Sequence, residues 1–154
     1  MIDAVLAVLV GKAELPPKGA MLGVGTSTVC DECERTRNVK KLEGFTRIQE
    51  MEHVDPELCL LEQGLVCNGP ATASGCGALC PAAGAPCVGC YGPSQDVLDY
   101  GARMVTSLAS VIDERDPERI DAVLDGLVDP TGCFYRFSLA KSVLGTGRAS
   151  WNGS

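Results

Sequence analysis

The sequence is poor in aromatic residues and in histidine. It contains three phenylalanines, three tyrosines, one tryptophan and a single histidine, His53, beside 18 glycines and nine prolines. An aromatic-poor, turn-rich chain of 154 residues does not favour a large regular core. The lone histidine leaves little material for zinc sites that mix cysteine with histidine. We expect His53 to be a surface or hydrogen-bonded residue, although histidine titrates near neutral pH.

Long hydrophobic runs and basic stripes are also missing. No apolar run approaches the length of about 20 residues that spans a bilayer, so we expect no membrane span. The apolar opening at residues 2–10 contains Asp3 and lacks the features of a secretory signal. The formal net charge is −7, and the basic residues from Arg35 to Arg47 are interleaved with acidic ones, which indicates a solvated loop. These patterns argue against nucleic acid as a partner.

Helical periodicity occurs towards both ends of the chain and is weak in its middle. Asp55, Ser94 and Asp116 stand where helix N-caps belong, and residues 129–132 are expected to form a turn. The hydrophobic pattern predicts helices over residues 2–10, 56–63, 95–113, 117–127 and 134–144. The predicted apolar stripe of the 95–113 helix comprises Val97, Leu98, Gly101, Val105, Leu108 and Ile112.

The first of these helices has no evident partner within the chain. Residues 2–10 are apolar on every side, and such a helix is normally buried. Lys12 to Gly25, which includes two adjacent prolines, is predicted to be a linker. We therefore expect residues 1–27 to be a helix and linker that belong to a domain elsewhere, and residues 28–154 to be a separate cysteine-rich domain. The predicted fold class of this domain is mainly α, with irregular cysteine-rich loops braced by a few helices.

Nine cysteines are the obvious means of holding the loops together. Eight lie between residues 30 and 90 and include two pairs at Cys-x2-Cys spacing. Four thiolates bind one 4Fe-4S cluster, but structural zinc sites use similar pairs, so spacing alone does not separate the two. Disulfides are less favoured, because they persist mainly in secreted proteins. The cysteines are Cys30, Cys33, Cys59, Cys67, Cys76, Cys80, Cys87, Cys90 and Cys133.

Small residues around the cysteines favour iron–sulfur clusters over zinc. Residues 68–78 and 82–86 are rich in glycine, alanine and proline. Such residues let the backbone approach a bulky cluster and point N–H groups at its sulfurs. The acidic residues Asp31, Glu32 and Glu34 would lower the potential of a neighbouring cluster if they point inward, whereas exposed carboxylates would be screened.

The segment from residue 59 to residue 93 resembles the C-terminal cluster region of the small subunits of cytoplasmic NiFe hydrogenases. It reads CLLEQGLVCNGPATASGCGALCPAAGAPCVGCYGP. The similar types are the F420-non-reducing (viologen-reducing) hydrogenases of methanogens and the sulfhydrogenases. The segments CDECER at residues 30–35 and DPTGCFYRFSL at residues 129–139 resemble the flanking parts of the same pattern.

The resemblance implies an electron relay through two 4Fe-4S clusters. It implies that a distal cluster is bound by Cys30, Cys33, Cys59 and Cys67, and a medial cluster by Cys76, Cys80, Cys87 and Cys90. Cys133 has no place in this scheme and is expected to be a buried or incidental thiol. The chain would be a non-catalytic subunit of a cytoplasmic oxidoreductase, passing electrons between the NiFe large subunit and an electron-acceptor subunit.

The chain departs from that family pattern at its start. A complete small subunit of the family begins with a flavodoxin-like domain bearing four more cysteines for a proximal cluster, whereas residues 1–29 contain no cysteine. We therefore expect either a proximal-cluster domain on another chain or a fragment. Two alternatives stay open, an independent ferredoxin-like carrier and a zinc-stabilised interaction module. Under all three hypotheses the metal-free chain should be largely unfolded, since ligand binding supplies much of the folding energy of small metal domains.

Overall fold

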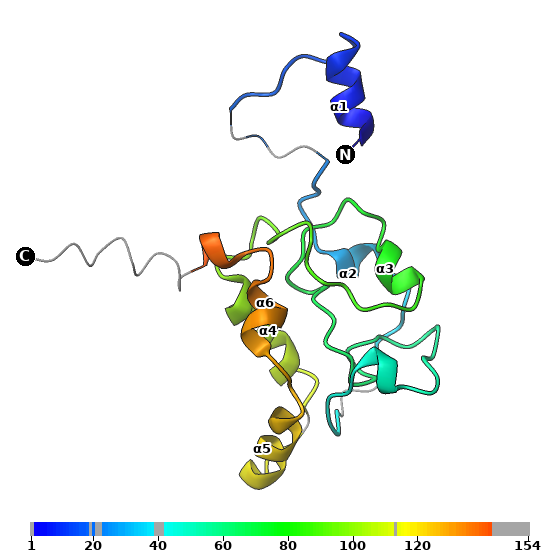
Figure 1. The fold of residues 1–154 in the computed structure, drawn as a ribbon, viewed down its shortest axis with the longest axis vertical. Coiled ribbons are helices and arrows are strands. Elements are labelled where there is room, and N and C mark those ends of the chain that lie inside the picture. The colour runs from blue at the N-terminus through cyan, green and yellow to red at the C-terminus, as the bar shows by residue number, and fades with distance from the viewer. Residues whose placement is uncertain (1, 19, 21–22, 39–41, 113, 143–154) are drawn as a thin grey trace, which may run out of the picture.

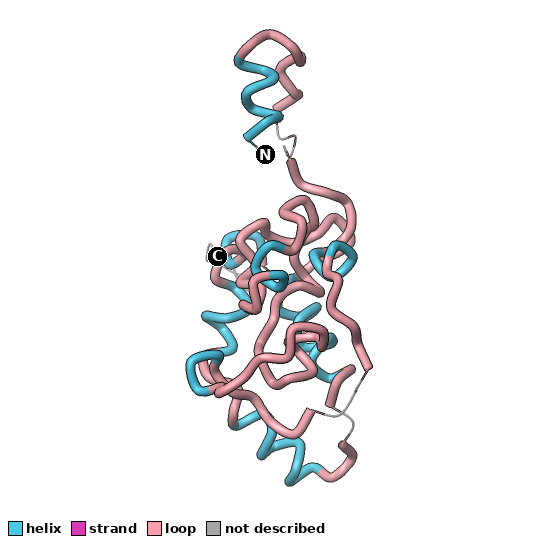
Figure 2. Tube along the Cα trace, turned by 90° about the vertical axis from the view of Figure 1, so that its right-hand side faces the viewer, coloured by secondary structure: helices cyan, strands magenta, loops and turns pink. Residues whose placement is uncertain are grey.

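Short helices separated by long loops make up the chain. The computed structural model describes residues 2–18, 20, 23–38, 42–112 and 114–142, within which three isolated bridges occur in place of regular strands (Figure 1). Loops occupy most of the chain between α2 and α4 (Figure 2). No helix in this part of the chain is long and apolar enough to cross a membrane. The helical elements are α1 (Ile2–Leu9), α2 (Val29–Glu32), η1 (Ile48–Glu50), α3 (Leu79–Ala82), α4 (Tyr100–Ala109), α5 (Pro117–Asp125), α6 (Pro130–Tyr135) and η2 (Leu139–Lys141).

α1 confirms the helix predicted at residues 2–10. None of its residues is buried, and Ile2 and Leu9 are each 75% exposed. Both ribbon and tube views show α1 standing apart from the rest of the structure (Figures 1 and 2). Its apolar surface is therefore left uncovered by the residues that the structure describes.

α4 is shorter than the helix predicted at residues 95–113, and it begins only at Tyr100. Asp99 is its N-cap and accepts the N–H of Ala102 at 2.9 Å. Ser94 does not cap the helix, because its N–H donates to the carbonyl of Ala71 and its hydroxyl donates to Asp96. These bonds hold the chain in a turn before the helix starts. Position 113 lies outside the described residues.

The buried face of α4 differs from the predicted stripe. Leu98 precedes the helix and is 96% exposed, and Val105 is 58% exposed. Leu98 was included because the prediction placed the helix start too early, whereas Val105 lies within α4 on its exposed side. Gly101 and Leu108 of the predicted stripe are buried. The buried residues of α4 are Tyr100, Gly101, Met104 and Leu108, and Val111 just beyond the helix is buried as well.

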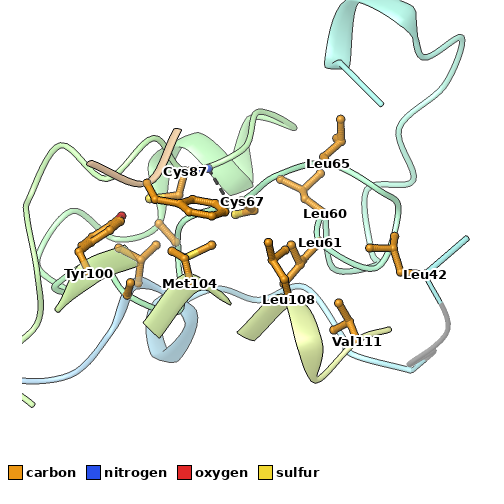
Figure 3. Close-up of a cluster of buried hydrophobic side chains, with 14 of the residues drawn as sticks. Leu42, Leu60, Leu61, Leu65, Cys67, Cys87, Tyr100, Met104, Leu108 and Val111 are labelled. Atoms are coloured by element: carbon orange, nitrogen blue, oxygen red, sulfur yellow. Dashed lines mark hydrogen bonds between the residues drawn. The ribbon is translucent and has the colours of Figure 1, made fainter. Parts of the chain in front are cut away.

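The core lies between α4 and the loop that precedes Cys67. Leu60, Leu61 and Leu65 are at most 2% exposed, and they belong with Met104 and Leu108 to one cluster of buried hydrophobic side chains (Figure 3). Burying such side chains contributes roughly 1.5–3 kcal/mol each. The helix thus braces the stretch of chain that carries two of the predicted ligands.

α5 and α6 are both capped by aspartates. Asp116 caps α5 as predicted and accepts the N–H of Glu118 at 3.2 Å. α6 begins earlier than the predicted 134–144 helix, because Asp129 caps it and Pro130 occupies its first turn. The segment expected to be a turn is therefore the start of a helix. Position 144 lies outside the described residues.

α4 and α6 pack closely at one glycine. The hydroxyl of Tyr135 donates to Oδ1 of Asp99 at 2.8 Å, which ties α6 to the N-cap of α4. A Cβ atom at Gly101 would overlap the Tyr135 ring. The glycine therefore permits the approach of the two helices.

The helix predicted at residues 56–63 is wrong. Asp55 does accept N–H groups, from Glu57 at 2.8 Å and Leu58 at 3.2 Å, as an N-cap would. The chain then extends, because the N–H of Cys59 donates to the carbonyl of Thr36 at 2.8 Å. This bond to a distant segment of the same chain uses the N–H of Cys59, which in a helix would donate to a carbonyl four residues earlier. The extended conformation places Cys59 beside the segment that contains Cys33.

Candidate metal centre

Backbone pairing brings the first four cysteines into one region. Cys30 lies in α2 and Cys33 is its C-cap residue. The N–H of Val29 donates to the carbonyl of Thr72 at 2.9 Å, which joins α2 to the segment after Cys67. On the other side, an isolated parallel bridge joins residues 36 and 58, next to Cys59. The segment with Cys30 and Cys33 therefore lies between those with Cys59 and Cys67.

The acid–base behaviour of Cys30 reflects this grouping. Cys30 is exposed as a residue, but desolvation of its sulfur, together with the nearby thiols of Cys67, Cys59 and Cys33, raises the pKa of the Cys30 thiol to about 12, against a smaller opposing effect of Arg37. Charge interactions between these thiols require close approach. The thiols of Cys67, Cys59 and Cys33 thus lie within range of a charge interaction with Cys30.

A glycine leaves room between two of these sulfurs. A Cβ atom at Gly69 would lie 3.0 Å from Sγ of Cys30 and 3.8 Å from Sγ of Cys67. Burial raises the pKa of the Cys67 thiol to about 11, against the opposing effect of the N–H groups of Gly69 and Cys87. The N–H of Cys87 donates to Sγ of Cys67 at 3.3 Å (Figure 3). A glycine and two N–H donors therefore lie beside the Cys67 sulfur, an environment that suits an iron–sulfur site.

The second set surrounds α3. Burial raises the pKa of the Cys87 thiol, and the neighbouring thiols of Cys76 and Cys90 act in the same direction. Cys76 and Cys90 thus lie within range of a charge interaction with Cys87. Cys80 lies within α3 and is exposed. α3 begins at Leu79, shortly after Cys76, so this helix determines where Cys80 lies relative to the other cysteines of the second set.

A single-ion site would need its ligands to converge. Among the residues that the structure describes, no three His, Cys, Asp or Glu side chains lie close enough together to share one metal ion. In a 4Fe-4S cluster each thiolate binds its own iron, so the four sulfurs surround a larger group.

Two charged residues join the first set of cysteines to the second. The carboxylate of Glu32 accepts the N–H groups of Gly75 and Gly77, at 2.7 and 2.9 Å, on either side of Cys76. The guanidinium of Arg35 donates to the carbonyls of Pro81 in α3 and Leu58, both at 2.9 Å. The loops of the two sets are therefore held against each other by side chains that follow Cys30.

The roles of these two residues differ from those expected from the sequence. The predicted solvated basic loop is wrong for Arg35, and for Glu32 the sequence left open a charge that lowers a cluster potential or an exposed, screened carboxylate. Glu32 instead acts as a hydrogen-bond acceptor for backbone, and Asp31 caps α2 by accepting the N–H of Thr28 at 2.7 Å. The backbone N–H of Thr28, followed by its hydroxyl, lowers the pKa of the Asp31 carboxyl. The sequence did place Glu32 within the first Cys-x2-Cys pair and Arg35 shortly after it, and that position was the available signal for their roles.

A buried polar cluster next to Cys87 was also missed. Oγ1 of Thr72 lies 2.6 Å from the carbonyl oxygen of Asn68, 2.7 Å from the Tyr100 hydroxyl and 3.5 Å from Sγ of Cys87. Burial raises the pKa of the Tyr100 hydroxyl. We call Asn68, Thr72 and Tyr100 the hydroxyl cluster. Its members are uncharged, so no pattern of titratable residues marked them.

The two remaining candidates lie outside the sets. His53 is exposed, as predicted for a surface histidine. Cys133 lies in α6 and is half-buried, and its main-chain carbonyl accepts a hydrogen bond from Nδ2 of Asn68 at 2.7 Å. Its sulfur lies 3.6 Å from the carbonyl oxygen of Val128. The described contacts of Cys133 are thus those of a packing residue.

Comparison with known proteins identifies the family. No family model matches the chain. A subunit of the F420-non-reducing hydrogenase of Methanothermus fervidus is 42% identical over 121 residues, which cover 74% of this chain and 93% of that protein. The corresponding subunit of the vhu F420-non-reducing hydrogenase of Methanococcus voltae is 40% identical over 142 residues, which cover 92% of this chain and 43% of that protein.

A third relative carries the cofactor class in its name. The iron-sulfur subunit of the F420-non-reducing hydrogenase of Archaeoglobus profundus is 38% identical over 142 residues, covering 90% of this chain. This chain spans 43% of the length of both the Archaeoglobus profundus and the Methanococcus voltae proteins. The resemblance seen in the cysteine segments is confirmed, and the chain belongs to the family of the iron-sulfur subunits of F420-non-reducing hydrogenases.

Proposed function

We propose that the chain holds two 4Fe-4S clusters and relays electrons through them within a NiFe hydrogenase complex. One cluster would be bound by Cys30, Cys33, Cys59 and Cys67, and the other by Cys76, Cys80, Cys87 and Cys90. Residues 28–154 would form the cluster-binding domain, with α4, α5 and α6 as its brace. The names of the relatives, which include an iron-sulfur subunit, support this assignment.

The observation that carries the proposal is the hydrogen bond from Cys87 to the sulfur of Cys67. It joins a ligand of the proposed second set to a ligand of the first at 3.3 Å. A bound 4Fe-4S cluster can accept and release an electron. Because Cys67 and Cys87 are in contact, the chain would hold the two clusters as neighbours, which a relay needs.

The donor set fits such clusters. The sulfurs of Cys67 and Cys87 are buried, and burial disfavours a bare thiolate. A metal supplies the positive charge that stabilises a thiolate there. Gly69 provides space between Cys30 and Cys67, and N–H groups point at sulfur. This chain's own residues thus bind and orient the clusters and limit the access of water.

The proposed partners follow from the family and from α1. The complex would be cytoplasmic and would include the NiFe large subunit, a proximal-cluster domain outside the described residues and an electron-acceptor subunit. α1 has an apolar surface with no buried residue, which supports attachment to a further domain. The chain spans 43% of the length of two of its relatives, which leaves room in those proteins for a further domain.

Metal and sulfide analysis of the anaerobically purified chain tests the cluster content. We expect about eight iron and eight acid-labile sulfide per chain, with 4Fe-4S signals in EPR after reduction. In the hydrogenase complex that contains the chain, H2 should reduce the clusters and so produce these signals. Zinc without sulfide would contradict the proposal, as would clusters that H2 leaves oxidised in the active complex.

A further inference from the structure

The Thr72 hydroxyl lies among three buried groups. Thr72 is 1% exposed and Tyr100 is 3% exposed, so water does not reach this hydroxyl. Oγ1 of Thr72 lies 2.6 Å from the carbonyl of Asn68, 2.7 Å from the Tyr100 hydroxyl and 3.5 Å from Sγ of Cys87. Figure 3 shows Tyr100 and Cys87 at the same end of the buried cluster. A ligand sulfur is therefore in contact with a side-chain hydroxyl.

The number of protons available limits how these contacts can be made. A threonine hydroxyl has one proton to donate and two lone pairs. With a protonated Cys87, the thiol donates to Thr72 and Thr72 donates to Asn68. A cysteine that binds iron is a thiolate, which has no proton and can only accept. The contact between Thr72 and Cys87 then persists only if the Thr72 proton turns towards the sulfur.

Two atoms lose a hydrogen-bond donor in this rearrangement, Oγ1 of Thr72 and the carbonyl oxygen of Asn68. Each of them has another donor within reach. Tyr100 lies 2.7 Å from Oγ1 of Thr72 and can donate to it. The carbonyl of Asn68 still accepts the N–H groups of Ala71 and Thr72, both at 3.2 Å. The rearrangement therefore leaves no buried carbonyl without a partner, a loss that would oppose it.

Gly89 makes the position of Tyr100 possible. It lies within the second Cys-x2-Cys pair and has φ of +85°, and a Cβ atom there would overlap the Tyr100 hydroxyl. The loop between Cys87 and Cys90 is therefore shaped around this hydroxyl. Tyr100 is also the first residue of α4, so the helix that braces the core fixes the donor in place.

We propose that the Thr72 hydroxyl donates a hydrogen bond to the Cys87 sulfur in the loaded protein, that Tyr100 donates to Thr72, and that this pair raises the reduction potential of the second cluster. The inference rests on the proposed function, since it concerns a cluster bound by Cys87. Adding an electron increases the negative charge on the sulfurs, so a donor stabilises the reduced state more than the oxidised one. Burial strengthens the effect, because no water replaces a lost donor.

Removal of the Thr72 hydroxyl tests the inference in the full chain, purified anaerobically with its clusters. Thr72→Val keeps the side-chain shape, and we expect it to make the midpoint potential of one cluster more negative in an EPR-monitored redox titration while the other stays unchanged. Tyr100→Phe should shift the same cluster in the same direction by less. Thr72→Ser, which keeps the hydroxyl, should leave both potentials unchanged.

Two further variants make the result specific. Cys90→Ser identifies which signal belongs to the second cluster. Tyr135→Phe removes a tyrosine hydroxyl that bonds to Asp99 rather than to the hydroxyl cluster, and it should leave both potentials unchanged. A shift of both clusters by the same amount in Thr72→Val would overturn the inference, because it would indicate a general loosening.

The inference and the proposed function fail in different ways. Full iron and sulfide content with no shift in Thr72→Val overturns the inference and leaves the proposed function intact. A wild-type chain without clusters overturns both. If Thr72→Val does not retain its clusters, the other two variants decide the matter. Tyr100→Phe must then shift the second cluster and Thr72→Ser must not, and any other pattern overturns the inference.

Discussion

At the residue scale, Glu32 is the side chain that connects α2 to the loop around Cys76. Its two carboxylate oxygens accept the N–H groups of Gly75 and Gly77 at 2.7 and 2.9 Å. Both glycines have positive φ, of +118° and +64°, so the loop adopts a conformation that other residues rarely take. The carboxylate therefore stabilises the conformation of the loop around Cys76.

Glu32→Gln should weaken the binding of the second cluster. The glutamine amide has a single oxygen in place of the two carboxylate oxygens, so it can replace only one of the two acceptors that bind the N–H groups of Gly75 and Gly77. We expect the free energy of unfolding of the cluster-loaded chain to fall by about 1 kcal/mol, the usual value for one lost hydrogen bond. Iron release to a chelator should accelerate, as followed by the loss of visible absorbance.

The matched control is Glu34→Gln, which removes the same charge from an exposed neighbouring position. It should leave both the stability and the rate of iron release unchanged. Equal effects of the two substitutions would contradict the hydrogen-bonding role and would indicate that net charge near α2 is what matters.

The contrast between cysteines and their supporting residues shows what the sequence could predict. The number and spacing of the cysteines marked them as candidate ligands, because thiols in such numbers have few alternative roles. Their division into two sets came from the family resemblance and stays a prediction. Glu32, Arg35, Thr72 and Tyr100 were not predicted as supporting residues. Each contacts a segment distant in sequence, such as Arg35 with Pro81, and such contacts leave no local periodicity.

At the element scale, tertiary contacts decided which of the predicted N-caps begin a helix. Asp116 was predicted correctly as the cap of α5, whereas Ser94 was displaced by Asp99 as the cap of α4. The N–H of Ser94 instead donates to the carbonyl of Ala71, so a tertiary contact overrode the local N-cap signal. The 56–63 helix failed for the same kind of reason, since Cys59 pairs with Thr36.

The packing of α4 on α6 predicts an unusual response to a helix-favouring substitution. Gly101→Ala would normally stabilise a helix by about 1 kcal/mol. Here the added methyl group would overlap the Tyr135 ring and disrupt its hydrogen bond to Asp99. We expect a net loss of roughly 1–3 kcal/mol in the free energy of unfolding, measured by urea denaturation.

The same substitution in a Tyr135→Ala background isolates the cause. Without the ring there is no overlap, so Gly101→Ala should there stabilise the chain. A double-mutant cycle then gives a large coupling between the two positions. If Gly101→Ala destabilises equally in both backgrounds, the close approach of α4 and α6 does not explain the glycine.

At the scale of the whole molecule, the core and the cysteine loops stabilise each other. The core cluster of buried side chains includes Leu60, Leu61 and Leu65, which lie between Cys59 and Cys67 in the sequence. Loops make up most of the chain from α2 to α4, and three isolated bridges join them among the described residues. Single backbone bonds and isolated bridges, rather than regular strand pairing, oppose the entropy of the loops that the structure describes, so we expect ligand binding to supply much of their stability.

Removal of the clusters should therefore unfold the loops. We expect hydrogen exchange after anaerobic removal of iron with a chelator to show rapid exchange at the amides of Val29, Cys59 and Ala73, which close the cross-chain bonds. Amides in the part of α4 that faces Leu60 and Leu61 should lose protection less, because apolar packing remains there. Protection that persists at all three loop amides in the iron-free chain would show that the loops fold without their metal, and the bridges rather than the clusters would then hold the cysteines in place.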